Sequence, residues 1–532
     1  MRAVLPILLA ALLAGGPSRA GAGGAQGADG ATADAPAAQL PALRRAVDAL
    51  DDEDVAAAER LVAPLLAGQP DDPAVQAVAG IVRFHEQRYA EAADLLGRSG
   101  LSTGAVDYLA LARAAREVTR DHARAESEHF VVSYPRGKDE VLVPYVLEAL
   151  EAQRVALEHD LGWAAPGKVT VEILRDTREL ARLSTLTEEE IKTSGTIALC
   201  KFDKLMMVSP RALVQGYEWL DTAAHEYTHY VVTARTRNRT PVWLHEGIAK
   251  FSETRWRGRG GEMSAAAAAR LREATRRGEL VGLAQMHPSL AKLPSQERAA
   301  LAFAEVESMV SWLQERGGGA LMNRVLDRIA RGVPAERAVA EALGEGFDAF
   351  LAGWKRWVLA RPAPAEVAAE AARLRFKDDP RHGGAHSEWA EIPDERARGF
   401  ARLGEILRER GKWAGARIEY AKAVARAGQG FAVLSDRFAL AAMMSGRDGE
   451  AERALVEALR RHPRYPALHV HLARLQVKRR SWAAAERELL LANAVDPFDP
   501  EIHAGLAAAY EATGDAERAG RERRFAQLLA GN

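Results

Sequence analysis

The middle of the chain alternates between short apolar runs and longer segments with a helical period. Runs rich in β-branched and aromatic residues predict four strands, over 130–134, 169–174, 196–200 and 205–208. Apolar residues recurring every three or four positions predict helices over 140–160, 213–233 and 242–256. This mixture predicts an α+β domain in which a small sheet packs against helices.

Helical patterns flank this domain on both sides and repeat themselves. On the C-terminal side, a turn followed by an alanine recurs at intervals of 35, 34 and 34 residues, at Ala416, Ala451, Ala485 and Ala519. On the N-terminal side, 34 residues separate Ala58 from Ala92. A small residue lets two antiparallel helices approach closely, and this period resembles that of tetratricopeptide (TPR) repeats. We therefore expect all-α repeats on both sides, with surfaces that bind a protein partner.

The first residues predict export. Met1 and Arg2 precede an apolar run from Val4 to Ala14, and a Gly/Ala-rich tract follows. This run is shorter than the roughly 20 residues of a membrane-spanning helix, and it has the composition of a signal peptide. No other segment reads as a transmembrane helix. The only cysteine is Cys200, so no intramolecular disulfide can form, which favours a periplasmic or secreted bacterial protein.

These patterns divide the chain into six expected segments. They are a signal peptide (1–22), a disordered Gly/Ala linker (23–39), TPR-like repeats (40–124), the α+β domain (126–360), a linker (361–395) and TPR repeats (396–532). Prolines and glycines concentrate in the second linker, which predicts that the C-terminal repeats fold as a separable unit. The formal net charge is −1, and this balance does not suggest a nucleic-acid-binding protein.

One short motif in the α+β domain carries chemistry. His225-Glu226-Tyr227-Thr228-His229 places two histidines four residues apart, on one face of the predicted helix. This spacing lets both imidazoles bind one Zn²⁺, and Glu226 is then positioned to act as general base. The motif also arises by chance in some chains with 14 histidines, so a zinc-free repeat protein is one alternative.

The next predicted helix supplies the third ligand. It carries Trp243-Leu244-His245-Glu246-Gly247-Ile248-Ala249, and His245 and Glu246 are adjacent, so only one of them can face the metal. HExxH followed by WLxEGxA resembles the gluzincin metallopeptidases, especially the bacterial peptidase-MA-like domains that are often joined to TPR repeats. The resemblance covers roughly residues 126–360 and implies Glu246 as the ligand, which leaves the fourth zinc position open for water.

The same resemblance implies how substrate is bound. In this family the strand ahead of the HExxH helix borders the site and can pair with an extended peptide. The matching residues are Gly195, Thr196, Ile197 and Ala198.

The resemblance also exposes one departure. A later helix, matching residues 301–313, commonly carries a tyrosine that stabilises the oxyanion, but the matching residue is Phe303, which has no donor. Candidate replacements for this donor are Tyr217, Tyr227, Tyr230 and His245. If His245 does not take this role, we expect it to line the wall of the site. Glu253 is either an acceptor for a ligand imidazole or a solvated acid.

The sequence therefore predicts an exported metallopeptidase that uses one Zn²⁺, bound by His225, His229 and Glu246, to hydrolyse a peptide or protein substrate. The alternative is a catalytically weak or inactive zinc-binding TPR scaffold of the cell envelope, which Phe303 favours. The intact Glu226 favours the enzyme, because zinc binding alone does not require that base.

Overall fold

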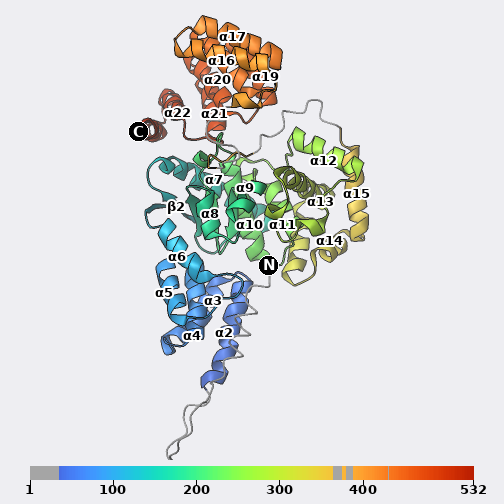
Figure 1. The fold of residues 1–532 in the computed structure, drawn as a ribbon. Helices are drawn as coiled ribbons and strands as arrows, with labels where there is room; N and C mark the ends of the chain where they lie inside the picture. Colours follow the sequence, from blue (N-terminus) through green and yellow to red (C-terminus); the bar gives the residue numbers. More distant parts are fainter. Residues whose placement is uncertain (1–34, 363–373, 379–387, 429, 532) are drawn as a thin grey trace, which may run out of the picture.

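The computed structural model describes residues 35–362, 374–378, 388–428 and 430–531. The expected signal peptide (1–22) and most of the first linker lie outside the described residues. Helical repeats flank a central α+β region, as the sequence predicts, with the N-terminal repeats at one end and the C-terminal repeats at the other (Figure 1). No helix in the described ranges is both long and apolar enough to cross a membrane.

The N-terminal repeats are built from neighbouring helices that pack in chain order. They are α2 (Ala35–Asp51), α3 (Val55–Gly68), α4 (Pro73–His85), α5 (Tyr89–Ser99) and α6 (Tyr108–Val118). The expectation of disorder over 23–39 is wrong at its end, because residues 35–39 already belong to α2. Alanine has the highest helix propensity, and Pro36 lies in the first turn, where a missing N–H costs little.

The described strands form one mixed sheet in the order β1-β2-β3-β5-β4. Their bounds are β1 (His122–Glu126), β2 (Phe130–Pro135), β3 (Val169–Leu174), β4 (Ala198–Lys201) and β5 (Lys204–Val208). β2, β3 and β5 are parallel, whereas β1 and β4 are antiparallel edge strands. The sequence prediction missed β1, whose only apolar residues are alanines. The expected boundary at residue 124 therefore falls inside a strand.

Helices complete the central region. They are η1 (Lys138–Leu142), α7 (Val143–Leu161), α8 (Thr177–Leu183), α9 (Glu188–Ser194), η2 (Pro210–Ala212), α10 (Trp219–Thr236), α11 (Val242–Ser252), η3 (Arg255–Arg257), α12 (Ala265–Arg277), η4 (Leu283–Met286), η5 (Leu290–Lys292), α13 (Gln296–Ala330), α14 (Ala335–Leu343) and α15 (Phe347–Ala360). The helix expected over 213–233 begins only at Trp219, because Leu213 instead forms a β-bridge with Phe376 of the linker.

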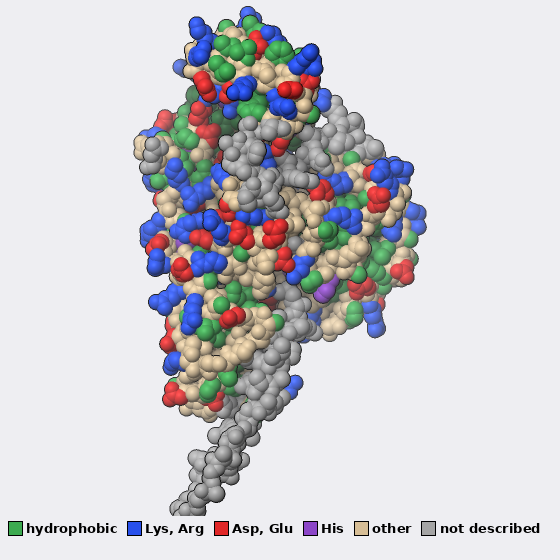
Figure 2. Space-filling model, viewed as in Figure 1, with side chains coloured by type: hydrophobic (Ala, Val, Ile, Leu, Met, Phe, Trp, Pro, Cys, Tyr) green, Lys and Arg blue, Asp and Glu red, His purple; other side chains and the backbone are tan. Residues whose placement is uncertain are grey.

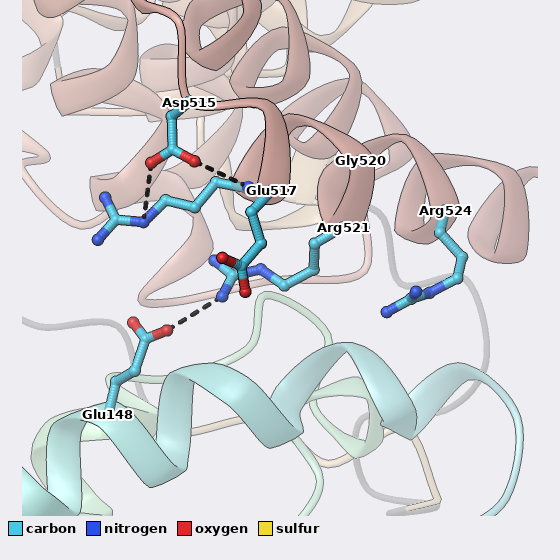
Figure 3. Close-up of a pocket in the computed structure, with 7 residues that line it drawn as sticks. Glu148, Asp515, Glu517, Gly520, Arg521 and Arg524 are labelled. Carbon is cyan, nitrogen blue, oxygen red and sulfur yellow. Dashed lines mark hydrogen bonds and ion pairs between the residues drawn. The ribbon is translucent and has the colours of Figure 1, made fainter.

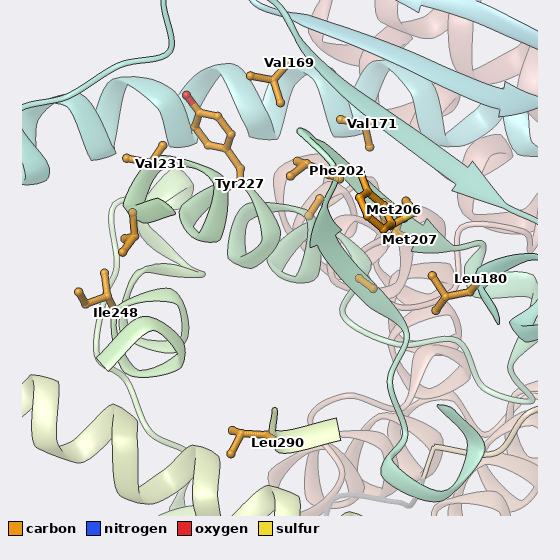
Figure 4. Close-up of a cluster of buried hydrophobic side chains, with 14 of the residues drawn as sticks. Val169, Val171, Leu180, Phe202, Met206, Met207, Tyr227, Val231, Ile248 and Leu290 are labelled. Atoms are coloured by element: carbon orange, nitrogen blue, oxygen red, sulfur yellow. The ribbon is translucent and has the colours of Figure 1, made fainter. Parts of the chain in front are cut away.

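The core of this region holds α10 against the sheet. Tyr227 and Val231 of α10 belong to one buried hydrophobic cluster with Val169 and Val171 of β3 (Figure 4). The rings of Tyr227 and Phe130 meet edge to face, with 4.9 Å between their centroids. Since side chains about half a turn apart lie on opposite faces of a helix, this packing directs His225 and His229 away from the sheet core.

The C-terminal repeats are four successive helix pairs preceded by η7 (Glu388–Glu391). Their helices are α16 (Glu395–Glu409), α17 (Trp413–Ala427), α18 (Ala432–Met444), α19 (Asp448–Arg461), α20 (Pro466–Lys478), α21 (Trp482–Asn493), α22 (Pro500–Thr513) and α23 (Ala516–Ala530). The four alanines that repeat in the sequence are all fully buried, as expected for the contact between paired helices.

These repeats also contact the central region. Arg521 on α23 donates to Glu148 on α7 at 3.0 Å, beside a hollow of about 700 Å³ that lies away from His225 and His229 (Figure 3). Arg464, in the loop before α20, lies 2.9 Å from Glu218 at the start of α10. On the face shown in Figure 2, acidic and basic side chains are intermixed rather than gathered by sign.

Candidate metal centre

The HExxH residues are brought together on the buried middle of α10. His225, Glu226 and His229 are 8%, 7% and 7% exposed, and one ligand atom from each lies within 4.8 Å of the others. Among the described residues, this is the group of histidines and acids whose spacing could hold a metal ion.

The following helix brings Glu246 to the same point. Oε2 of Glu246 lies 3.5 Å from Nε2 of His225 and 3.3 Å from Nε2 of His229. Gly247 makes this approach possible, because a Cβ there would lie 2.6 Å from the carbonyl oxygen of Val306 on α13. The glycine of the WLxEGxA pattern therefore lets α11 pack directly on α13.

His245, the competing ligand, is engaged elsewhere. Its Nε2 lies 3.0 Å from Oγ1 of Thr233 and 3.3 Å from the carbonyl oxygen of His229. Its ring stacks on that of His229, with 4.3 Å between centroids. Burial and the nearby His229 lower the pKa of His245 to about 3. This geometry fits a neutral wall residue better than a metal ligand.

Glu226 faces the same site from the next position on α10. Burial raises the pKa of Glu226, while the two imidazoles and a hydrogen bond from the backbone N–H of Cys200 lower it in part. Sequence reasoning missed this N–H, because a main-chain donor leaves no trace in the residue types. Edge strand β4 therefore lies beside the Glu226 carboxylate.

In the metal-free protein, a positive charge on His225 is balanced by the negative charge on Glu246. Burial opposes a charge on His225, but hydrogen bonds to Glu246 and Glu253 raise its pKa to about 10. Burial likewise opposes a charge on Glu246, but the two imidazoles hold its pKa well below the usual range. Without a metal, His225 is therefore an imidazolium beside the Glu246 carboxylate. To bind a metal ion, His225 would have to lose its proton, so that two neutral imidazoles and the carboxylate face the cation.

Glu253 lies on the far side of the first imidazole. Its Oε2 is 3.4 Å from Nδ1 of His225, and its Oε1 accepts a hydrogen bond from Lys250 at 2.5 Å. Burial would raise the pKa of Glu253, but Lys250 and His225 lower it to about 2. The sequence contained a signal for Lys250, because a lysine three residues before a glutamate on a helix commonly pairs with it. By contrast, Nδ1 of His229 has no hydrogen-bond partner among the described residues.

The three tyrosines expected near the site point elsewhere. Tyr217 donates its hydroxyl to the carbonyl of Val208. Tyr230 hydrogen-bonds to Asp203 in the β4–β5 turn. Tyr227 lies in the hydrophobic core. Neither Tyr217 nor Tyr230 is a free donor, whereas the Phe303 ring does face His225, with 6.1 Å between centroids.

The expected substrate strand is displaced along the chain. Gly195 is the left-handed cap of α9, with φ of +74°, and the N–H of Thr196 still bonds to Ile191 of that helix. The strand therefore begins at Ala198, so Gly195, Thr196 and Ile197 were assigned to it wrongly. The N–H groups of Gly195 and Thr196 end the preceding helix, whereas the carbonyl of Ile197 already accepts a hydrogen bond from the N–H of Val208 on β5.

Two family models match the chain. Residues 151–360 match the model of the peptidase MA superfamily, and residues 442–509 match that of the tetratricopeptide repeat. The central domain is a peptidase-MA domain. The TPR match covers the middle of the C-terminal repeats.

The solved structures that resemble this chain are distant from it. No curated protein matches the chain significantly. Leukotriene A4 hydrolase from Saccharomyces cerevisiae is 11% identical, over 77% of this chain and 67% of that one, with a TM-score of 0.30. PilF of Pseudomonas aeruginosa is 15% identical, over 42% of this chain and 94% of that one, with a TM-score of 0.24.

Proposed function

We propose that this protein is an exported zinc-dependent peptidase that hydrolyses peptide bonds, with repeats that bind a protein partner. The observation that carries the proposal is that Glu246 Oε2 lies 3.5 Å from His225 Nε2 and 3.3 Å from His229 Nε2, with Glu226 in the same cluster. Export is proposed from the composition of residues 1–22 alone.

The residues present fit one zinc ion. Two imidazole nitrogens and one carboxylate oxygen form the donor set of a catalytic zinc site with an open position. Glu246 and Glu226 both lie near the histidines, but Glu246 contacts both Nε2 atoms, while Glu226 lies beside the N–H of Cys200. His225, His229 and Glu246 would therefore hold the ion, and Glu226 remains for acid–base chemistry. Bound zinc would supply Lewis acidity, which acidifies a water molecule and polarises a carbonyl.

Glu226 then carries out both proton transfers of the reaction, and neighbouring residues hold the site in place. Glu226 accepts a proton from the water whose oxygen attacks the peptide carbonyl, and it returns that proton to the leaving nitrogen as the C–N bond breaks. Its buried position and raised pKa suit a group that must hold a proton between these two steps. Glu253 orients His225 through Nδ1, and Lys250 holds Glu253 in place.

The second candidate function is a zinc-binding TPR scaffold with weak or no catalysis. Phe303 favours it, because this ring faces His225 where a hydroxyl would serve the oxyanion, and both Tyr217 and Tyr230 are committed elsewhere. Losing one such donor costs about 100- to 1,000-fold in turnover. The retained Glu226 supports the enzyme instead.

Metal analysis and a digest separate these functions. Purified protein should contain close to one zinc per chain, and His229→Ala should lose it. Incubation with a random peptide library, followed by mass spectrometry, should yield cleavage products. Stoichiometric zinc without any product would favour the scaffold, and no zinc in either protein would contradict both functions.

A further inference from the structure

The edge strand beside the metal centre offers very little backbone to a substrate. β4 spans only Ala198–Lys201 and pairs with β5 on one side. In an antiparallel pair, alternate residues turn their N–H and C=O groups outward. The register and the Ile197–Val208 bond leave Ala198 and Cys200 facing outward, and the N–H of Cys200 lies beside the Glu226 carboxylate.

The beginning of this strand is closed by α13. A Cβ on Gly195 would lie only 3.0 Å from Cδ of Gln296, the first residue of α13. The Gln296 side chain is itself fixed, since it accepts from the N–H of Leu374 at 3.0 Å and donates to its carbonyl at 3.3 Å. The same helix continues past His225 and packs on Gly247 of α11, so it spans from the β4 side of the site to the α11 side.

The other end of the strand is held by the N-terminal repeats. Phe202, in the turn after β4, packs against Phe84, His85 and Tyr108 with ring centroids 5.2, 5.7 and 5.8 Å away. Next to this turn, the fully buried Lys204 donates to Tyr89 at 2.6 Å and to Glu172 at 2.7 Å. The N-terminal repeats therefore pack against the β4–β5 hairpin, which contains the edge strand.

The same repeats also contact the chain just after α10. The turn between α2 and α3 contacts the connection between α10 and α11. Asn238 donates to the carbonyl of Asp51 at 3.3 Å, and Arg239 lies 3.5 Å from Asp52. The N-terminal repeats therefore contact both the β4–β5 turn and the end of α10.

We infer that the site accepts short peptides, with about four extended residues (about 13 Å) lying along β4, and excludes the internal segments of long chains. This inference rests on the proposed function and names its substrate class. The N-terminal repeats then serve as a wall of the site, in contrast to the partner-binding role expected from the sequence.

The test uses binding rather than turnover, so that catalytic rate does not enter. Full-length protein loaded with one equivalent of zinc is titrated calorimetrically with alanine-based phosphinic peptides, whose phosphinate binds the metal. A short probe extends one residue on each side of the phosphinate, and a long probe extends six. We expect the long probe to bind at least about tenfold more weakly, because its extensions meet α13 and the N-terminal repeats.

Opening variants sharpen the test. Gln296→Ala and the double variant Asp52→Ala/Asn238→Ala should recover binding of the long probe and leave the short probe unchanged. Asp94→Ala, which breaks the exposed Asp94–Arg98 pair elsewhere on the N-terminal repeats, is the matched control and should change neither.

Equal or tighter binding of the long probe to the wild type would overturn the inference. So would failure of the short probe to bind a protein that holds zinc. Failure to take up zinc, measured first, would instead contradict the proposed function and remove the basis of the inference with it.

Discussion

The indole Nε1 of Trp219 donates a hydrogen bond to the carbonyl of Asn493 at 2.8 Å. Trp219 is the first residue of the metal-site helix and is fully buried, and Asn493 ends α21 of the C-terminal repeats. Two residues earlier, the N–H of Tyr217 bonds to the carbonyl of Val495 at 3.0 Å. Gly216 is required beside it, because a Cβ there would lie 2.1 Å from that carbonyl oxygen. The start of α10 is thus built against the repeats.

The sequence led us to expect separable C-terminal repeats, and this contact leads us to predict the opposite. A chain truncated after Arg361 would expose Trp219, at a cost of about 2–3 kcal/mol from that side chain alone. We predict a lower unfolding midpoint and weaker zinc binding, measured by chemical denaturation and chelator competition. Full-length Arg464→Ala is the control, since it removes only the partly exposed pair with Glu218 and should cost less than about 1 kcal/mol. An unchanged midpoint after truncation would contradict the prediction.

Zinc affinity should depend steeply on pH. The pKa of His225 is about 10 in the metal-free protein, so this imidazole is protonated at neutral pH and must lose its proton to bind a metal. Because the neutral form grows as pH rises toward that pKa, zinc affinity should increase about tenfold per pH unit between about pH 6 and 9. Glu246 adds no dependence there, since its lowered pKa keeps it ionised. Affinity that stays level over this range, after correction for the chelator, would refute the prediction.

The third ligand can be assigned by two adjacent substitutions. Glu246→Ala removes the carboxylate that meets both Nε2 atoms and should weaken zinc binding more than about a hundredfold. His245→Ala removes a ring already bonded to Thr233 and should change affinity less than about tenfold. Titration against a competing chelator distinguishes them. The reverse order of effects would show that His245 is the ligand.

Phe303 provides a gain-of-function test. Phe303→Tyr places a hydroxyl on the ring that faces His225, and a single oxyanion donor is worth about 100- to 1,000-fold in turnover. We expect a higher kcat on any peptide the wild type cleaves, with unchanged zinc content. Phe303→Leu is the control that changes the ring without adding a donor. Equal turnover by both variants would argue that another group already serves the oxyanion.

Local patterns predicted much of this fold, and long-range contacts account for what they missed. Alternating apolar residues located β2, β3 and β5, and the 34-residue spacing located buried alanines such as Ala451. The start of α10 was misplaced because Leu213 pairs with Phe376, more than 160 residues away. The edge strand was misplaced because Gly195 completes α9. The HExxH motif predicted the metal-site residues, but no local pattern predicted how the central region contacts the repeats at both ends.

Glu226 is proposed as the base at a zinc site, and one substitution tests this role most directly. Glu226→Gln keeps the shape of the side chain but removes its capacity to take a proton. Turnover of a peptide found in the library digest should be measured with both proteins at equal zinc content. We predict that the variant binds zinc like the wild type and loses about 100- to 10,000-fold in kcat. A fully loaded variant that cleaves at the wild-type rate would contradict the account.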